Sequence, residues 1–342
     1  MSWRCLILLL LTGLPVFATT GPVESDPAMP TGAEPIRQRD PARAALYQGR
    51  GIELVGAGKF ELALDQFRRA LAFEPADVNA LVNAAYCLDR LGRYDDAIEE
   101  LQRAEKLNPT NPMIFINWGN SLINLKKFED AVEPLERARD LDASNQLVRL
   151  NLAAAFANSG HPDKALPELA VAAAINSNNP TVFINWAVIL TGLGQTDEAI
   201  AKYRHASEID TNNTSVLFNL AVLEEKLGRH QAAATALEKA AQLDPKNDMI
   251  AFNLAVVLAA TGESARAIAA YDRVIALAPK NISAYYNCAA LYERAGNIAG
   301  AIEKIEAALQ VDPGNATLRD ILNRLKATRD KHPGILPGAT LQ

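Results

Sequence analysis

The sequence predicts an all-α array of eight 34-residue helix-turn-helix units, closed by a C-terminal capping helix. Three observations predict this fold: an alanine recurs every 34 residues in all eight units, a glycine precedes it by five residues in seven of them, and prolines recur at the same spacing. The chain has 342 residues, of which 49% are hydrophobic and 22% are charged, which suits a folded protein. A single hydrophobic core seldom exceeds roughly 250–300 residues, so this length favours a repeat array or two domains.

The first 18 residues have the pattern of a secretory signal peptide. Arg4 precedes the apolar run Cys5–Phe17, and Ala18 suits a cleavage site. This run is shorter than the roughly 20 residues that a membrane-spanning helix needs, which favours a cleaved signal peptide. The alternative is that the segment stays uncleaved and anchors the protein. Residues 19–43 are rich in proline and glycine and predict a flexible leader. We therefore expect secretion across the inner membrane, with a bacterial periplasm as the leading setting by analogy, and no membrane span after cleavage.

The repeat frame is set by columns of identical or similar residues. The invariant column consists of Ala63, Ala97, Ala131, Ala165, Ala199, Ala233, Ala267 and Ala301. Prolines mark the same period at Pro75, Pro109, Pro245, Pro279 and Pro313. The eight predicted units within 44–315 are 44–77, 78–111, 112–145, 146–179, 180–213, 214–247, 248–281 and 282–315.

Each unit is expected to form two short helices in a fixed order. Glycine ends the first helix because it tolerates the left-handed backbone conformation, although Lys126 takes this place in the third unit. Alanine in the second helix lets two helix axes approach closely. Proline stops the second helix, and Asn or Asp in the connecting turn caps the next first helix. One unit cannot bury its own apolar face, but stacked neighbours can.

Some residues depart from this regular pattern. Pro134 and Pro167 fall inside predicted second helices, where each should remove a backbone hydrogen bond and bend the stack locally. Arg149 and Glu224 occupy first-helix positions that should face the core. These four residues make the middle of the array less regular without changing its fold.

The end of the array carries one further amphipathic segment. Leu318, Ile321, Leu322 and Leu325 form an apolar stripe within residues 316–329, which predicts a capping helix that covers the last unit. Residues 330–342 contain two prolines and two glycines and predict a disordered tail.

The 34-residue pattern resembles the tetratricopeptide repeat family. The resemblance covers residues 44–315 and implies a right-handed α-solenoid, or superhelix. It also implies that positions 2, 5, 6 and 9 of each unit line the concave surface of that superhelix. The repeat motif names an architecture and no chemistry.

A column of asparagines points to a function. At position 6, seven consecutive units carry Asn83, Asn117, Asn151, Asn185, Asn219, Asn253 and Asn287. An amide offers two donors and an acceptor, which match the C=O and N–H groups of a peptide bond. Positions 5 and 9 add the further candidate peptide-binding residues Tyr86, Ile116, Asn120, Ile184, Phe218, Phe252 and Tyr286.

The family resemblance suggests a function for the asparagine column. The repeat domain of O-linked N-acetylglucosamine transferases carries a similar asparagine ladder, so the resemblance implies a groove that binds extended polypeptide segments. The structural alternative is that the asparagines bond between adjacent helices. Trp118 and Trp186, in the repeated motif PxxFINW, are expected to pack in the core.

The sequence lacks the residue patterns that are typical of several classes of function. The four histidines have no partner at metal-ligand spacing, and the sequence has neither a phosphate-binding glycine loop nor a nucleophile elbow, so we expect no enzyme activity, no metal and no cofactor. The net charge of −6 argues against nucleic-acid partners. Positions 2, 5, 6 and 9 carry no Lys or Arg from the second unit onward, which argues against a clamp for acidic C-termini. Cys87 and Cys288 are expected to be buried thiols.

The sequence therefore predicts an exported, non-enzymatic adaptor that binds extended segments of partner proteins. Two alternatives stay open. One is a self-assembling structural scaffold, which would be a homo-oligomer. The other is an accessory subunit of an envelope secretion or polysaccharide-export machine.

Overall fold

The computed structural model describes residues 39–331, which contain 17 helices and no strands. The predicted signal peptide, almost all of the predicted leader and most of the predicted tail lie outside the described residues. The helices are α1 (Pro41–Gly56), α2 (Phe60–Phe73), α3 (Val78–Arg90), α4 (Tyr94–Leu107), α5 (Pro112–Asn124), α6 (Phe128–Leu141), α7 (Gln146–Asn158), α8 (Pro162–Ile175), α9 (Pro180–Gly192), α10 (Thr196–Ile209), α11 (Thr214–Lys226), α12 (His230–Leu243), α13 (Asp248–Ala260), α14 (Ser264–Leu277), α15 (Ile282–Arg294), α16 (Ile298–Val311) and α17 (Ala316–Lys331).

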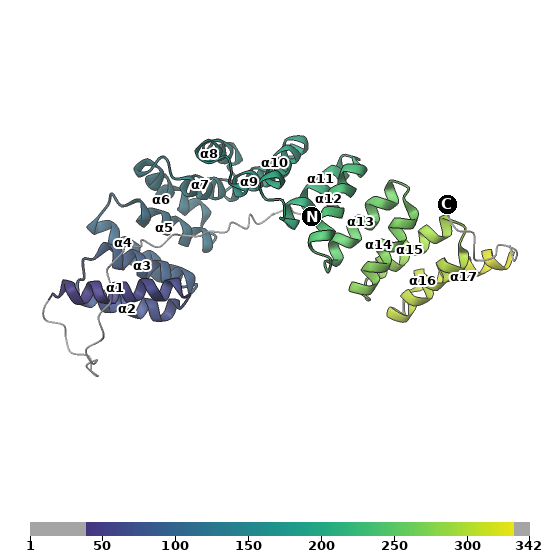
Figure 1. Ribbon diagram of the computed structural model, residues 1–342, viewed down its shortest axis with the longest axis horizontal. Helices are drawn as coiled ribbons and strands as arrows, with labels where there is room; N and C mark the ends of the chain where they lie inside the picture. The colour runs from purple at the N-terminus through teal and green to yellow at the C-terminus, as the bar shows by residue number, and fades with distance from the viewer. Residues whose placement is uncertain (1–38, 332–342) are drawn as a thin grey trace. The chain divides into compact units, whose positions relative to one another are not determined.

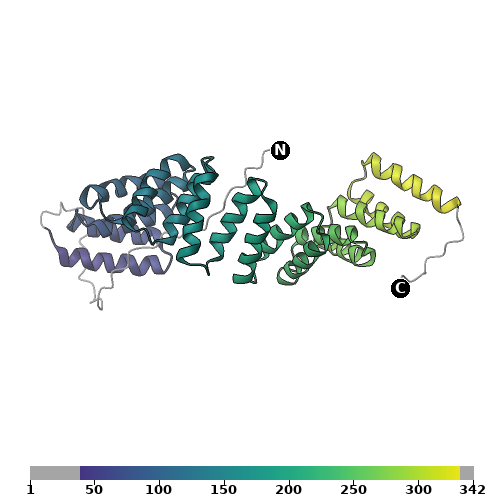
Figure 2. The same cartoon turned by 90° about the horizontal axis from the view of Figure 1, so that it is seen from above.

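The helices form two compact units, whose boundary falls between Gly192 and Leu193, inside the fifth repeat. The described part of the first unit holds α1–α9, and that of the second holds α10–α17. Within each unit every helix packs on the next one along the chain, as Figures 1 and 2 show. The predicted all-α helical-repeat fold is therefore confirmed, with odd-numbered first helices, even-numbered second helices and α17 at the end.

The alanine column marks the tightest point of each second helix. All eight of its alanines have no exposed surface. The seven predicted glycines lie at the ends of first helices with φ between 69° and 89°, and Lys126 adopts the same left-handed conformation with φ 61°. The two columns therefore have the physical roles that the sequence predicts: small side chains at a close approach and a left-handed residue at a turn.

Polar caps and prolines shape the remaining helix ends. Asp77 and Asn145, for example, precede first helices and accept backbone hydrogen bonds from their first turn. Pro134 and Pro167 lie inside α6 and α8, and both helices run through them without a break. The packing of each helix on its neighbours offsets the single hydrogen bond that a proline removes.

Both charged residues in core-facing positions are paired with opposite charges. Arg149 Nη1 lies 2.7 Å from Glu168 Oε2, and the other oxygen of Glu168 lies 3.3 Å from Arg139 Nη1. Glu224, which is 1% exposed, pairs with Arg204 and lies 3.6 Å from Arg229 Nη1. These ion pairs explain how the array accommodates a charge where the family pattern has an apolar side chain.

The two described cysteines are free thiols with no exposed surface. Burial raises the pKa of Cys87 to about 12 and is also the main cause that raises the pKa of Cys288 to about 12. Because the thiolate is the reactive form, we expect neither cysteine to react with an aromatic disulfide reagent in the native protein at pH 8. In a Cys5→Ser variant, which keeps only these two thiols, both should react within minutes in 6 M guanidinium, as absorbance of the released thiolate would report. Rapid labelling of the folded variant would contradict this burial.

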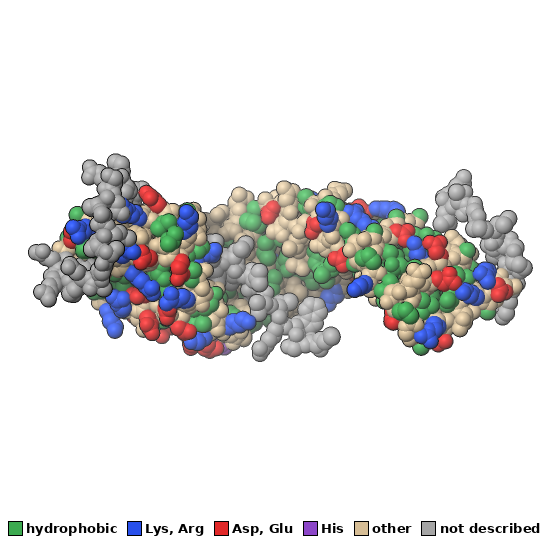
Figure 3. All heavy atoms as spheres, turned by 90° about the horizontal axis from the view of Figure 1, so that it is seen from below, with side chains coloured by type: hydrophobic (Ala, Val, Ile, Leu, Met, Phe, Trp, Pro, Cys, Tyr) green, Lys and Arg blue, Asp and Glu red, His purple; other side chains and the backbone are tan. Residues whose placement is uncertain are grey.

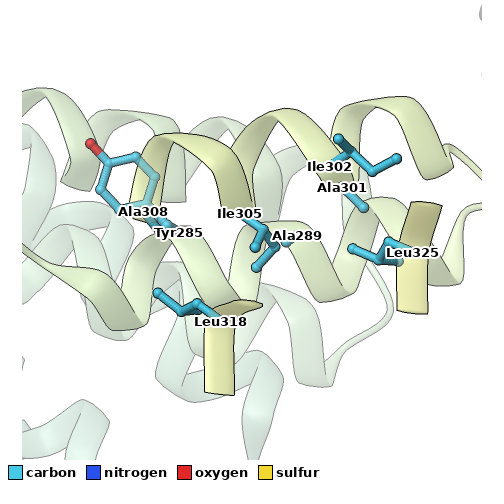
Figure 4. Close-up of a cluster of buried hydrophobic side chains, with 8 residues drawn as sticks. All are labelled: Tyr285, Ala289, Ala301, Ile302, Ile305, Ala308, Leu318 and Leu325. Atoms are coloured by element: carbon cyan, nitrogen blue, oxygen red, sulfur yellow. The ribbon is translucent and has the colours of Figure 1, made fainter. Parts of the chain in front are cut away.

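The last helix covers the open side of the eighth repeat. Leu318 and Leu325 of α17 are buried against α15 and α16, where they meet Ala289, Ile305 and Ala308 (Figure 4). The opposite face of α17 is exposed and charged, for example at Arg319 and Asp320. This arrangement gives the array a polar end in place of an unpartnered apolar one.

Candidate functional site

In the first unit the asparagine column is buried. Asn83, Asn117, Asn151 and Asn185 are each at most 5% exposed. In this unit consecutive first helices also touch each other, α3 with α5, α5 with α7 and α7 with α9, whereas such contacts are sparser between α11 and α13 or between α13 and α15. The close approach of first helices encloses the amides, so the accessible part of the column is in the second unit.

The buried amides of the first unit form a sparse polar network. Asn151 donates a 2.5 Å hydrogen bond to Asn120 Oδ1 in the preceding repeat. Among the described residues, Asn117 Nδ2, Asn151 Oδ1 and Asn185 Nδ2 have no hydrogen-bond partner. Such atoms are costly in a dry interior, since each forfeits its bonds to water.

A second polar contact in this network links α3 to α5. The Ser121 hydroxyl donates to Asp89 Oδ1 at 2.9 Å, and Asn124 Nδ2 donates to both carboxylate oxygens at 3.2 Å. Burial nevertheless raises the pKa of Asp89, because it disfavours the charged form more strongly than these bonds favour it.

This shift predicts how an Asp89→Asn variant depends on pH. A raised pKa in the folded state means that Asp89 contributes stability below its unfolded pKa, and this contribution is lost as pH rises through the folded pKa. We therefore expect the variant, whose Oδ1 can accept from both donors, to gain stability relative to wild type between pH 3.5 and pH 7. Urea denaturation at both pH values measures this, and a relative loss at pH 7 would contradict it.

In the second unit the asparagines lie at the surface. Asn219, Asn253 and Asn287 are half-buried. Asn253 Nδ2 donates to Met249 O of its own helix at 2.8 Å, and Asn287 hydrogen-bonds to Tyr271. Burial raises the pKa of the Tyr271 hydroxyl, and the bond from Asn287 offsets part of that shift. These amides can exchange such local bonds for bonds to a ligand.

Apolar side chains surround these amides on α11, α13 and α15. Met249 is 60% exposed, Tyr286 is 47% exposed and Val222 is 39% exposed. Phe218 and Phe252 beside them are half-buried, and the ring of Phe252 meets that of Tyr271 edge to face at 5.8 Å. Figure 3 shows hydrophobic side chains at the surface of the second unit among charged ones. We call this set of residues on α11, α13 and α15 the asparagine face.

The other predicted binding residues lie in the first unit, apart from this face. Ile116 and Asn120 are buried, Ile184 is half-buried, and Tyr86 is half-buried with its ring edge-on to Phe60 at 6.2 Å. Helical spacing placed all these residues on one side of the first helices. It could not show how closely successive first helices approach, which decides whether that side is accessible.

Within residues 39–331, no group of three or more His, Cys, Asp or Glu side chains could hold a metal ion. No helix there combines the length and apolarity needed to cross a membrane. Trp118, for which the sequence predicts core packing, is half-buried and lines a cleft.

Family models and solved structures agree with this architecture. Tetratricopeptide repeat models match residues 49–112, 185–248 and 218–282, residues 81–209, and residues 254–326. No curated protein sequence is significantly similar to this chain.

Solved structures share the fold at low sequence identity. The C-terminal part of a repeat-containing protein from Cytophaga hutchinsonii has a TM-score of 0.63 at 18% identity and covers 70% of this chain and 98% of its own. YrrB, described as a tetratricopeptide repeat protein with an unusual peptide-binding site, has a TM-score of 0.46 at 21% identity and covers 54% and 94%. MamA from Desulfovibrio magneticus has a TM-score of 0.48 at 18% identity and covers 50% and 97%. The family models, which together match residues 49–326, show that the chain belongs to the tetratricopeptide repeat family.

Proposed function

We propose that this protein is an exported interaction scaffold that binds extended polypeptide segments along the asparagine face. The observation that supports this most is the alternation, on α11, α13 and α15, of half-buried amides with exposed apolar side chains. Asn219, Asn253 and Asn287 recur once per repeat, and Val222, Met249 and Tyr286 lie beside them.

The chemistry of the asparagine face suits a peptide backbone. Each amide can accept from an N–H and donate to a C=O, independent of the peptide's side chains. The apolar side chains offer contacts for alternate hydrophobic residues of an extended segment. No Lys or Arg occupies positions 2, 5, 6 or 9 of these three repeats, so the face does not favour an acidic ligand.

The test separates backbone binding from side-chain binding. A photoreactive residue at Val222 should capture a partner segment, which is then synthesised as overlapping peptides. Replacing Asn219, Asn253 and Asn287 by Ala should weaken every binding peptide alike, by roughly fivefold for each hydrogen bond of about 1 kcal/mol. Met249→Ser should instead weaken peptides selectively, according to their apolar residues.

A matched control lies on a second helix of the same unit. Leu243 is 39% exposed, like Val222, and belongs to α12. Leu243→Ser should leave peptide affinity unchanged, and a photoreactive residue there should not capture the partner segment. Equal capture at both positions, or full affinity in the triple alanine variant, would contradict the proposal.

A second candidate function, self-assembly, is favoured by a separate apolar column. The residue that ends each second helix is 36–47% exposed in six repeats: Leu107, Leu141, Ile175, Leu243, Leu277 and Val311. Leu141→Lys with Ile175→Lys would then abolish concentration-dependent light scattering of the purified protein. A wild-type chain that stays monomeric at 100 μM would argue against this candidate and leave the peptide-binding proposal intact.

A further inference from the structure

A cleft opens between α4 and α6 in the first unit. Its volume is about 550 Å³, and α5 forms its floor. The three helices follow one another along the chain, and α5 packs on both α4 and α6 (Figure 1). The floor consists of Phe115, Trp118 and Leu122, and Pro134 of α6 forms part of one wall.

One residue that lines the cleft departs from the repeat pattern. Pro134 occupies position 23 of its unit, where the next unit has Glu168 and the last unit has Lys304. Glu168 pairs with Arg149 at 2.7 Å, and Lys304 pairs with Asp272 at 2.7 Å. The short proline ring has no such reach and forms no ion pair, and it lines the cleft together with half-buried Trp118.

The rim of the cleft is acidic. Five carboxylates and two bases line it, a formal charge of −3. Glu105 pairs with Arg137, and Asp95 lies 3.6 Å from Lys127. The three remaining carboxylates are exposed and have no ion-pair partner within residues 39–331: Glu99, Asp130 and Glu133.

The cleft already holds one cation against an aromatic ring. The Arg137 guanidinium lies 4.1 Å from the centroid of the Phe115 ring. Trp118 is a stronger cation–π acceptor than phenylalanine, and within residues 39–331 no Lys or Arg stacks on its ring. A planar guanidinium can stack on an indole while it bonds to carboxylates, whereas an ammonium has no such planar face.

We propose that this cleft binds an arginine-containing segment of a partner protein. One guanidinium stacks on Trp118, and Glu99, Asp130 and Glu133 pair with it and with neighbouring cations of the segment. The site is independent of the asparagine face, because it lies in the first unit on different helices. The partner recognised here is cationic, unlike the apolar segment proposed for the asparagine face.

Short peptides of one residue type test the proposal on the purified protein. Titration calorimetry in 50 mM NaCl should show that acetylated tetra-arginine amide binds at least tenfold more tightly than tetralysine, and that tetraglutamate does not bind. The triple variant Glu99→Gln, Asp130→Asn, Glu133→Gln should lose at least tenfold in tetra-arginine affinity. Trp118→Leu should lower arginine affinity to the lysine value, because it removes the stacking surface and keeps the charge.

The controls separate this site from general attraction by an acidic protein. The variant Asp163→Asn, Glu198→Gln, Glu303→Gln removes the same charge from exposed positions outside the cleft and should bind tetra-arginine like wild type. Equal weakening in both triple variants would overturn the proposal. The proposal would also be overturned if the cleft triple variant, with a circular dichroism spectrum like that of wild type, bound tetra-arginine with unchanged affinity. It would likewise be overturned if wild type bound tetra-arginine no more tightly than tetralysine.

Discussion

Replacing Ala165 with tryptophan is expected to destabilise the first unit by at least about 3 kcal/mol, at the upper end of what overpacking a core costs. Ala165 belongs to the fully buried column in α8 and has no exposed surface. A tryptophan there must either displace the neighbouring helices or leave its rotamer minimum. Guanidinium denaturation followed by circular dichroism measures the loss.

The same helix supplies a matched control for this substitution. Ala170, five residues further along α8, is exposed. Ala170→Trp should change stability by less than about 0.5 kcal/mol, as surface substitutions usually do. Equal effects at the two positions would mean that the size of the residue in the alanine column does not limit how closely the helices pack.

Removing the charge of Glu168 is expected to have the second large effect. This carboxylate is 12% exposed and joins Arg149, 14% exposed, to Arg139, 25% exposed. Glu168→Gln would leave Arg149 without its carboxylate partner in a largely buried place, while Arg139 keeps Asp140 at 3.0 Å. The unpaired Arg149 charge should cost about 3 kcal/mol of unfolding free energy. Urea denaturation at pH 7 checks this value.

A double variant distinguishes the cost of an unpaired charge from the value of the ion pair. Arg149→Met with Glu168→Leu replaces both charges by apolar side chains of similar volume, and such replacements are often neutral or stabilising. We expect the double variant to be more stable than Glu168→Gln alone. If it were equally unstable, the loss would come from packing and not from the uncompensated charge.

The sequence predicted the parts of the fold that depend on local chemistry. The alanine column, the glycine turns and the Asn caps each follow from one residue type at one backbone position, so spacing alone located them. Lys126 shows that the turn geometry is imposed by the repeat, since a residue with a Cβ atom adopts φ 61° there. The capping helix followed from a simple apolar stripe.

The candidate site was less predictable because it depends on how neighbouring repeats pack. Asn117 and Asn253 occupy the same repeat position, yet the first is buried and the second is half-buried. Both residues have the same repeat position and the same helix propensity. Their exposure differs because successive first helices pack more closely in the first unit than in the second. The cleft at Trp118 likewise depends on how α4, α5 and α6 pack, because residues of all three helices line it, and a helical wheel shows only one helix at a time.

The fully buried alanines have a consequence for how such a chain can change length. Because every second helix presents the same methyl group to its neighbours, removing 34 consecutive residues within either unit rejoins surfaces of matching shape. Removing a number of residues that is not a multiple of 34 moves a different side chain into a place sized for that methyl group. The chain can therefore be shortened or extended by whole 34-residue repeats, and not by part of a repeat.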